Sequence, residues 1–366
     1  METRSSRRKT RKTRSWVKWT AGLIIFCAVL VLGFGGYLFF QAYQAAKSSY
    51  QPIDRPEHKS QLRETVPTIG QDPISILLMG IEDYSTDGEN GRADTLIVVT
   101  LNPDTDEMTM VSVPRDTKVE IDEIPKWEGT HKINSAYTYG AISGYGANKL
   151  AIQKVEELLE VPIDEYVAVD FKGFVEVVNA LGGVTVDIKY GFWEENIFNH
   201  DKKIYFEKGT SHLNGEEALA FVRMRKRDVN TVYSRMERQR QFLKSALDQA
   251  ISAGTVFKID EIGDILGEHV ETSLTPSEIY SLEKVYSSMD PSSIRTLKIE
   301  GADKRIPTGT GPYYFIPDED SLSTITEKLK KSLGLETDTS SSEEGSTDNS
   351  SEETTESDNG TSDTEG

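Results

Sequence analysis

Several charged side chains stand at the ends of apolar runs, where they could contact a ligand. Two carboxylates, Glu82 and Asp83, follow Gly80-Ile81 directly after the apolar run at 74–79. In an α/β protein, ligands commonly bind beyond the carboxyl ends of strands, so this pair is a candidate for ligand contact. An equally simple interpretation of this segment alone is two carboxylates in an exposed turn.

A second segment places an arginine near a carboxylate, just ahead of the apolar run at 95–101. Arg92 and Asp94 are two residues apart and point to the same side of an extended chain. The arginine keeps the carboxylate ionised, which suits Asp94 to bind a hard cation such as Mg²⁺. The alternative is a surface ion pair worth at most about 1 kcal/mol.

Two further cations follow along the chain. Arg115 comes after the apolar run at 108–113 and is expected at the end of the sheet, while Asp116 is expected to cap the turn. Lys132 stands in His-Lys-Ile-Asn, a segment expected to open a helix. It would add another positive charge near Arg115.

The segment 213–241 holds the densest group of arginines. A short helix is expected to run to about Phe221, and Arg223 and Arg225 then share one face of an extended chain. The alternation of these arginines with apolar residues predicts that the opposite face is buried.

A long amphipathic helix is expected next, and its arginines divide between its faces. Arg235 and Gln239 are four residues apart and share a stripe with the apolar Phe242. Arg238 and Arg240 fall on other faces and are expected to be solvated.

The arginines are informative because the chain as a whole is acidic, with a net charge of −19. Arginines buried at strand ends need compensating negative charge, or each costs several kcal/mol. Few acidic residues lie beside these arginines in the sequence. A phosphate-containing ligand with a divalent metal would satisfy them, because guanidinium donors match phosphate oxygens bidentately.

The two ends of the chain predict a membrane anchor between them. Residues 1–18 contain eight Lys/Arg, and residues 19–40 contain no charge over 22 positions. As a helix this segment spans roughly 33 Å, enough for the ~30 Å hydrocarbon core. The positive-inside rule keeps the N-terminus in the cytoplasm. We therefore expect a single-pass, type II protein of the plasma membrane with its domain outside. The alternative is a cleaved signal peptide, although its apolar run is usually only about 7–15 residues long.

The exported part divides into three regions. Residues 41–72 are polar and proline-containing and are expected to form a stalk, and residues 73–334 are expected to fold as one domain. Residues 335–366 contain eleven Asp/Glu and no Lys/Arg. This tail buries too little apolar surface to offset its chain entropy and is expected to be disordered. The only cysteine, Cys27, lies in the predicted span, so the exported part has no disulfide.

Apolar periodicity predicts strands and helices that alternate along the domain. Strands are expected at Ile74–Met79, Thr95–Leu101, Met108–Val113, Tyr166–Val169, Val184–Ile188 and Ile294–Ile299. Helices are expected at Lys149–Leu159, Phe174–Leu181, Met236–Ile251, Pro276–Tyr286 and Asp320–Leu333. This alternation indicates an α/β domain whose central sheet is covered on both faces.

The segments GIED, GRADT, VPRDT, HKINSAY, LGGVTVD, LNGEEALAFVRMR and YSRMERQRQ, in this order, resemble the LytR-CpsA-Psr family. The resemblance covers roughly residues 74–250. It implies a three-layer α/β/α sandwich with a central mixed sheet, preceded by one transmembrane helix. It also implies a phosphotransferase that attaches teichoic acid, capsule or similar glycopolymers to peptidoglycan, taking them from a polyprenyl pyrophosphate whose lipid tail lies in an apolar cleft.

The resemblance also implies roles for the residues singled out above. The pyrophosphate would be bound by Arg92, Arg115, Arg223, Arg225, Arg235 and Gln239, and Lys132, singled out above for its charge, is expected to join them. Catalysis would fall to Arg92, Asp94, Arg115, Arg223 and Arg225, and Mg²⁺ would be the cofactor. Asp94 would help to hold the metal. The family places an Asp directly after Gly-Ile or Gly-Val, where this chain has Glu82, so either Glu82 or Asp83 is expected as the second metal ligand.

The expected partners are the lipid-linked glycopolymer, the peptidoglycan acceptor and the membrane. Two other functions remain open from the sequence: a hydrolase of the same lipid-linked substrate, and a non-enzymatic membrane-bound regulator. No helix-turn-helix is recognisable, and the domain is acidic and predicted to lie outside the membrane, so no nucleic-acid partner is expected.

Overall fold

The computed structural model describes residues 49–83, 90–252, 269–289 and 293–335. Within these ranges, no helix has the length and apolar character needed to cross a membrane. The predicted basic segment 1–18, the predicted span at 19–40 and all but the first residue of the predicted tail lie outside the described residues.

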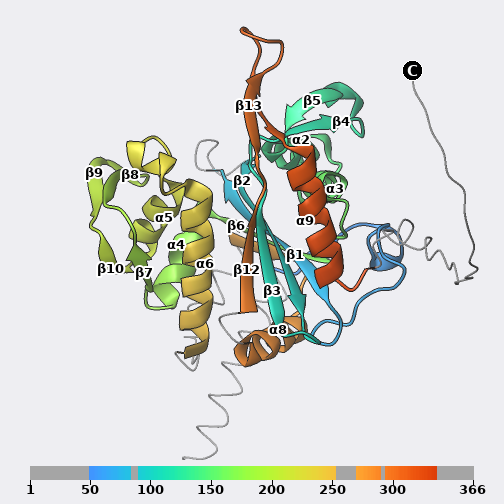
Figure 1. The fold of residues 1–366 in the computed structure, drawn as a ribbon, viewed down its shortest axis with the longest axis horizontal. Coiled ribbons are helices and arrows are strands. Elements are labelled where there is room, and N and C mark those ends of the chain that lie inside the picture. The colour runs from blue at the N-terminus through green and yellow to red at the C-terminus, as the bar shows by residue number, and fades with distance from the viewer. Residues whose placement is uncertain (1–48, 84–89, 253–268, 290–292, 336–366) are drawn as a thin grey trace, which may run out of the picture.

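The centre of the domain is a mixed six-stranded sheet in the order β11-β6-β1-β2-β3-β12 (Figure 1). β1 is parallel to β6, and β3 is parallel to β12, whereas the other neighbours are antiparallel. The strands are β1 (Ile74–Glu82), β2 (Arg92–Asn102), β3 (Glu107–Ser112), β6 (Glu165–Asp170), β11 (Val270–Thr272) and β12 (Ile294–Lys298). The α/β fold with a mixed central sheet, predicted from the sequence, is confirmed.

The remaining elements are helices and two-stranded sheets. The helices are α2 (Asn134–Ser143), α3 (Ala147–Leu159), α4 (Phe171–Ala180), α5 (Gly215–Arg223), α6 (Arg235–Ser252), α8 (Pro276–Ser288) and α9 (Glu319–Ser332), with 3-10 turns at Pro56–His58, Pro125–Trp127 and Asp228–Thr231. The strands of the two-stranded sheets are β4 (Lys118–Ile121), β5 (Gly129–Lys132), β7 (Val184–Ile188), β8 (Phe192–Asn196), β9 (Asn199–Phe206), β10 (Gly209–Leu213), β13 (Gly301–Arg305) and β14 (Tyr313–Pro317).

Helices pack on both faces of the sheet because its strands alternate two apolar sets. Leu77 and Met79 of β1 pack with α3 and α9 on one face. Ile74 and Ile76 of the same strand face the other side, toward α6 and α8. A third apolar cluster joins α4, α5 and α6 to strands β7 to β10. In Figure 1, α6 lies between this group and the sheet.

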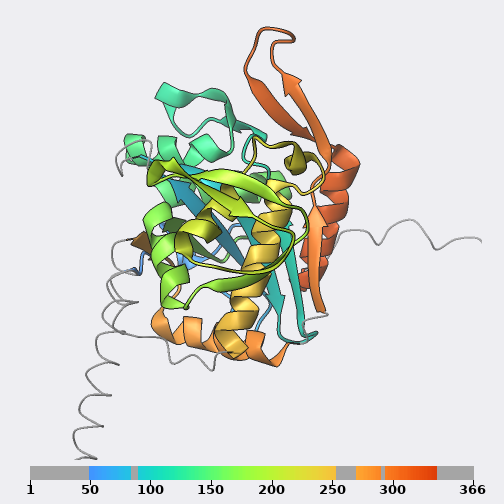
Figure 2. The same cartoon turned by 90° about the vertical axis from the view of Figure 1, so that its left-hand side faces the viewer.

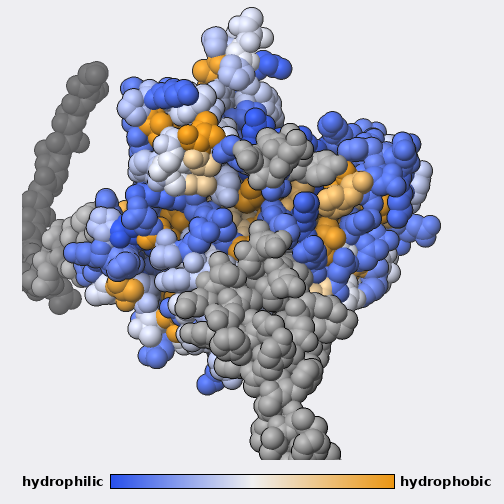
Figure 3. Space-filling view, turned by 180° about the vertical axis from the view of Figure 1, so that it is seen from behind, coloured by the Kyte–Doolittle hydropathy of each residue, from blue (hydrophilic) through white to orange (hydrophobic). Residues whose placement is uncertain are grey.

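On the one face shown in space-filling form, most of the described surface is hydrophilic (Figure 3). From behind, apolar residues show only as separate small patches between hydrophilic ones (Figure 3). The β13–β14 hairpin projects beyond the sheet in two perpendicular views (Figures 1 and 2). Its base contacts the segment after β3, because the Phe315 N–H donates to the Asp116 carbonyl at 2.8 Å.

The predicted stalk is described from residue 49 onward, and this part packs on the domain instead of standing free. Nε and Nη2 of Arg63 each lie 2.7 Å from the carboxylate of buried Asp164. Arg55 donates to the Ile163 carbonyl at 2.8 Å. Tyr50 forms an isolated bridge with Thr272 of β11. The two arginines supply positive charge and hydrogen-bond donors to Asp164 and to the Ile163 carbonyl, just before β6. No hydrophobic periodicity in the sequence predicts such contacts.

Candidate functional site

One edge of the sheet gathers most of the residues singled out from the sequence. β1 and β6 are parallel and both end there, β2 begins there, and β3 ends there. Glu82 is the last residue of β1 and lies opposite Arg92, the first residue of β2. Arg115 follows the end of β3 by three residues. Short turns beyond these strand ends therefore present charged side chains to one region.

A β-bulge places Asp94 at this edge. Gly80 pairs with Thr95, but the next residue, Ile81, pairs with Ala93, so Asp94 has no register partner on β1. A bulge bends the strand locally and re-aims the side chain of the extra residue. The side-chain alternation that placed Arg92 and Asp94 on one side of the strand is interrupted here.

Asp94 is the centre of a network of ion pairs and hydrogen bonds. Its Oδ2 accepts a hydrogen bond from Nη1 of Arg115 and lies 3.9 Å from Nη1 of Arg235. Its Oδ1 accepts from Nδ2 of Asn134 at 3.0 Å. Burial alone would raise the pKa of Asp94, but the two guanidinium groups and the amide outweigh burial and lower it. Asp94 is therefore ionised, and both of its oxygens are already engaged, which makes it a poor proton acceptor.

Arg235 shows that four guanidinium groups lie close together. Burial lowers the pKa of Arg235 to about 10, and the positive charges of Arg115, Arg225 and Arg223 act in the same direction against the opposing effect of Asp94. The side chain of Arg235 is only 13% exposed. The four arginines, Arg115, Arg223, Arg225 and Arg235, together with Asp94 are called the arginine cluster below. At Arg235, three other guanidinium groups act against the one opposing carboxylate, Asp94, so the cluster is suited to an anionic ligand.

Gln239, one helical turn after Arg235, supports the cluster from α6. Its Nε2 donates to Oγ1 of Thr95 at 2.9 Å and approaches the Val222 carbonyl at 3.4 Å. The Nε of Arg235 lies 3.4 Å from that same carbonyl. The predicted stripe of Arg235 and Gln239 on one face of the helix thus links α6 to both β2 and the end of α5.

Arg223 and Arg225 reach the cluster by a different backbone from the one expected. α5 continues through Arg223, two residues beyond the predicted end, and only Met224 and Arg225 leave the helix. Met224 is buried and Arg225 is exposed. The guanidinium carbon of Arg223 lies 4.9 Å from the centre of the Phe171 ring. Burial lowers the pKa of Arg223 below its ordinary value, and the carboxylates of Glu194, Glu82 and Asp94 offset this only in part.

Lys132 stands next to Arg115 through a shared carboxylate. Its Nζ lies 2.7 Å from Oδ1 of Asp116, and the Nε of Arg115 lies 3.5 Å from Oδ2. Lys132 also sits over the ring of Tyr313 from the β13–β14 hairpin, at 5.4 Å. Contrary to expectation, Lys132 belongs to strand β5, and the helix begins only at Asn134.

The remaining predicted residues are less tightly joined to the cluster. Arg92 is exposed at the start of β2, and the described contacts include none between it and Asp94. Glu82 is close enough to affect the charge of Arg223. Asp83 lies toward β6: burial raises its pKa, and the charges of Asp170 and Glu82 act in the same direction.

The residues at this edge fit a magnesium ion only in part. The described residues contain no group of three or more His, Cys, Asp or Glu side chains arranged to hold a metal. Mg²⁺, however, is commonly bound by one or two carboxylates together with substrate phosphates and water. Asp94 and Glu82 come from adjacent strands at this edge and supply the oxygen ligands that such a site needs.

The expectation that Arg238 and Arg240 are solvated is wrong. Arg238 is 0% exposed, and its guanidinium donates to the carbonyls of Phe221, Tyr233 and Met224. Arg240 is half-buried and donates to Oγ of Ser112 at 3.1 Å. The helix contacts the sheet, α5 and β7 at once, so more of its circumference is buried than one apolar stripe indicates.

Asn134, Arg238 and the pair formed by Asp170 and His269 were missed by the sequence reasoning. Asn134 belongs to a motif already singled out, HKINSAY, and is the residue that opens α2. Arg238 had only its helical position as a signal, and that signal was misleading. His269 lies 99 residues from its partner, Nδ1 being 2.7 Å from Oδ2 of Asp170, and no local pattern joins the two.

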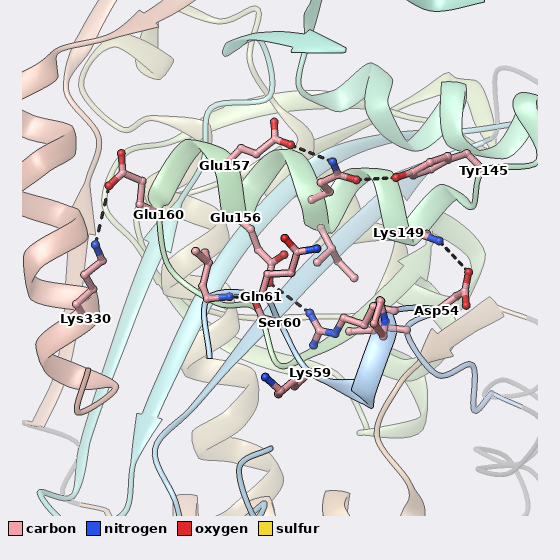
Figure 4. A pocket seen from close by; sticks show the side chains of 16 residues that line it. Asp54, Lys59, Ser60, Gln61, Tyr145, Lys149, Glu156, Glu157, Glu160 and Lys330 are labelled. Atoms are coloured by element: carbon pink, nitrogen blue, oxygen red, sulfur yellow. Dashed lines mark hydrogen bonds and ion pairs between the residues drawn. The ribbon is translucent and has the colours of Figure 1, made fainter. Parts of the chain in front are cut away.

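A cavity of about 620 Å³ lies away from the arginine cluster, between the segment 53–62 and α3 (Figure 4). Its wall carries side chains of both charges, several already paired. Lys149 lies 2.8 Å from Asp54, and Lys330 lies 3.9 Å from Glu160. The residues of the arginine cluster do not line this cavity. Its balanced charges do not suit a pyrophosphate, so the edge of the sheet is the better candidate.

Comparison with known proteins agrees with this choice. The model of the LytR_cpsA_psr family matches residues 36–331. The polyisoprenyl-teichoic acid–peptidoglycan teichoic acid transferase TagV of Bacillus subtilis (strain 168) is 42% identical over 319 residues, which are 87% of this chain and 79% of that protein. The crystal structure of B. subtilis TagV has a TM-score of 0.61 and covers 73% of this chain and 99% of its own. A structure of YwtF (TagT) with bound octaprenyl pyrophosphate lipid is 28% identical, with a TM-score of 0.60 and coverage of 78% and 100%.

Proposed function

The chain belongs to the LytR-CpsA-Psr family, and we propose that it transfers a phosphate-linked glycopolymer from a polyprenyl pyrophosphate carrier to peptidoglycan. The observation that carries this proposal is the arginine cluster, in which the largely buried Arg235 lies near three other guanidinium groups and Asp94. The activity named for the B. subtilis relative and the octaprenyl pyrophosphate bound to the related structure support the same substrate class. The glycopolymer is a teichoic acid or a similar polymer.

The cluster provides what phosphoryl transfer requires from a protein. Little covalent chemistry is needed, so catalysis depends on position and on stabilisation of charge. Arg115 and Arg235 are held in place by Asp94, and Arg223 rests on the ring of Phe171. Guanidinium groups fixed in this way stabilise negative charge as the polyprenyl phosphate leaves. Lys132 adds a positive charge on the side of Arg115.

We further propose Mg²⁺ as the cofactor, held by Asp94 together with Glu82 or Asp83. Bound there, it would neutralise charge on the transferred phosphate. Glu82 is the better second ligand, because its charge acts on Arg223 of the cluster. Asp83 lies toward Asp170, and burial raises its pKa, which disfavours the ionised form that a metal ligand needs. Mutation of Glu82 should therefore weaken magnesium-dependent lipid binding more than mutation of Asp83.

The lipid tail and the membrane complete the proposal. Partly exposed apolar side chains of α6 and α8 pack, together with Val167 of β6, on one face of the sheet, among them Leu243, Leu247, Leu282 and Val285. This region would accommodate a prenyl chain. With the uncharged segment 19–40 as a single-pass anchor, the domain would stand on the extracytoplasmic side of the plasma membrane, where its acceptor is found.

A transfer assay with labelled lipid-linked polymer and purified peptidoglycan tests the proposal. Wild-type protein should attach label to peptidoglycan, and Arg115→Ala and Arg235→Ala should each reduce the rate by about 10–100-fold, the value of one charge-assisted contact. Arg295→Ala is the matched control, because Arg295 pairs with Glu107 at the opposite edge of the same sheet. Release of labelled phosphate product into solution, with none on peptidoglycan, would identify a hydrolase instead.

A further inference from the structure

A histidine–aspartate pair lies at the same edge of the sheet as the arginine cluster. Asp170 is the last residue of β6 and pairs in register with Ile81, the residue before Glu82. Val270 of β11 pairs with Val169, so the preceding residue, His269, reaches Asp170 from the other side. Nδ1 of His269 lies 2.7 Å from Oδ2 of Asp170. The proposed pyrophosphate and metal contacts do not use this pair.

The pair is held in a fixed orientation. Oδ1 of Asp170 accepts the Gly173 N–H at 2.7 Å and caps the N-terminus of α4, while Oδ2 contacts the imidazole. A Cβ at position 173 would come within 2.6 Å of the Cβ of His269, so the glycine permits this close approach. With Nδ1 donating to the carboxylate, Nε2 is the nitrogen that accepts a proton. The two side chains are 20% and 18% exposed, which leaves the ring accessible to a substrate.

One contact connects the pair to the arginine cluster, and charge interactions connect it to Glu82. Phe171, the residue after Asp170, carries the guanidinium of Arg223 over its ring at 4.9 Å. Asp83 lies close enough to both Asp170 and Glu82 for each to affect its charge. An acceptor hydroxyl aligned with a pyrophosphate on the cluster would thus approach along the edge that His269 borders.

A proton acceptor is what the arginine cluster itself lacks. Both oxygens of Asp94 are engaged by Arg115 and Asn134, and arginines do not accept protons at neutral pH. We propose that His269 is a catalytic residue that accepts the proton of the acceptor hydroxyl, and that Asp170 is the positioning residue for its imidazole. This inference rests on the transfer reaction proposed above.

The proposed transfer forms one phosphorus–oxygen bond and breaks another. The hydroxyl oxygen of the acceptor forms a bond to the phosphorus that carries the glycopolymer, and its proton passes to Nε2 of His269. The bond from this phosphorus to the bridging oxygen breaks, and polyprenyl phosphate leaves with the electron pair. The imidazolium, stabilised by Asp170, then returns its proton to solvent or to the leaving phosphate.

The experiment must separate this role from a purely structural one, in which the pair only fastens β11 to α4. His269→Asn keeps an N–H donor for Asp170 but has no basic nitrogen, and His269→Ala leaves room for a small base. Asp170→Asn keeps the helix cap, because Asn caps as well as Asp. His212→Ala is the control, since His212 hydrogen-bonds Thr185 and the Gly182 carbonyl at the two-stranded sheet of β7 and β10.

With full-length protein, His269→Asn and His269→Ala should lower kcat for transfer by about 100-fold or more, the usual contribution of a general base. KM for the lipid substrate and the melting temperature should stay near the wild-type values. Imidazole added to the buffer should restore part of the rate of His269→Ala but none of the rate of Arg115→Ala. Asp170→Asn should lower kcat with KM unchanged, and His212→Ala should match wild type.

The inference is overturned if His269→Asn transfers within about threefold of wild type, a loss far below that of a general base. It is also overturned if kcat falls only together with lipid binding or melting temperature and added imidazole restores nothing. Failure of the proposed function looks different: wild-type protein itself would bind the lipid yet attach no label to peptidoglycan, and both proposals would then fall.

Discussion

Replacement of Arg238 by Ala should destabilise the fold, although a neighbouring arginine on the same helix should be dispensable. The guanidinium of Arg238 is fully buried and donates to three backbone carbonyls, those of Phe221, Met224 and Tyr233. The first two lie at the carboxyl end of α5, where helix carbonyls have no partner within the helix. Arg238, a residue of α6, therefore caps the carboxyl end of α5.

The magnitude follows from these contacts. A hydrogen bond to a charged group contributes about 1.5–3 kcal/mol, and three of them oppose the desolvation that lowers the pKa of Arg238 to about 10. Loss of the side chain leaves three buried carbonyls unsatisfied, so we expect a net cost of about 3–5 kcal/mol. At about 2–4 °C per kcal/mol for a domain of this size, the melting temperature should fall by roughly 10 °C.

Thermal and urea unfolding of the full-length protein in detergent measures this effect. Arg240→Ala is the control, since its half-buried side chain donates only to Oγ of Ser112 and should cost about 1 kcal/mol. Arg238→Lys should also destabilise, because one ammonium cannot reach three carbonyls. A melting temperature of Arg238→Ala within about 2 °C of wild type, equivalent to about 1 kcal/mol or less, would refute the reasoning.

Three further predictions follow from charge and burial. Because the pKa of Asp94 is lowered in the fold, its ion pairs stabilise the protein above the ordinary Asp pKa of about 3.9, and this stabilisation is lost as pH falls below that value. The melting temperature of Asp94→Asn should therefore approach that of wild type at low pH. A difference in melting temperature that does not depend on pH would contradict this. Burial raises the pKa of Glu165 to about 7. The contribution of the Glu165 side chain to stability is therefore complete below about pH 4 and is lost as pH rises through 7. Glu165→Gln should melt at a higher temperature than wild type at pH 8 but not at about pH 4. Deletion of residues 336–366, which contain no apolar side chain, should leave the melting temperature and the transfer rate unchanged, and a large loss of either would show that the tail packs or participates.

The sequence was sufficient for five of the six strands of the sheet, all but the short β11, because the side chains of those five reflect burial directly. The apolar runs in β1, β2 and β3 lie where expected, each within a few residues of the observed bounds. The long helices α3, α6 and α9 were equally legible, since their apolar residues repeat with the helical period. Strand ends followed from these runs, which is why Asp94 and Arg115 were expected near one edge.

The details of the candidate site depend on contacts that no local pattern encodes. The bulge at Asp94 arises from the register with β1, and its ion pairs join β2 to the segment after β3 and to α6. The burial of Arg238 follows from α5 ending against α6, a tertiary contact. His269 meets Asp170 only because β11 adds to the far side of β6. Hydrophobic periodicity predicts which face of a helix or strand is buried. It does not predict which other residues are covered when a second or third element packs on that helix or strand.

The central claim is that the arginine cluster binds a lipid pyrophosphate, and a crystal structure of this protein with octaprenyl pyrophosphate tests it most directly. We predict that phosphate oxygens lie within hydrogen-bonding distance, about 2.7–3.2 Å, of the guanidinium groups of Arg115, Arg223 and Arg235. The prenyl chain should run between α6, α8 and the sheet. A pyrophosphate bound in the cavity beside Lys149 and Lys330, with the arginine cluster free of ligand, would contradict the account.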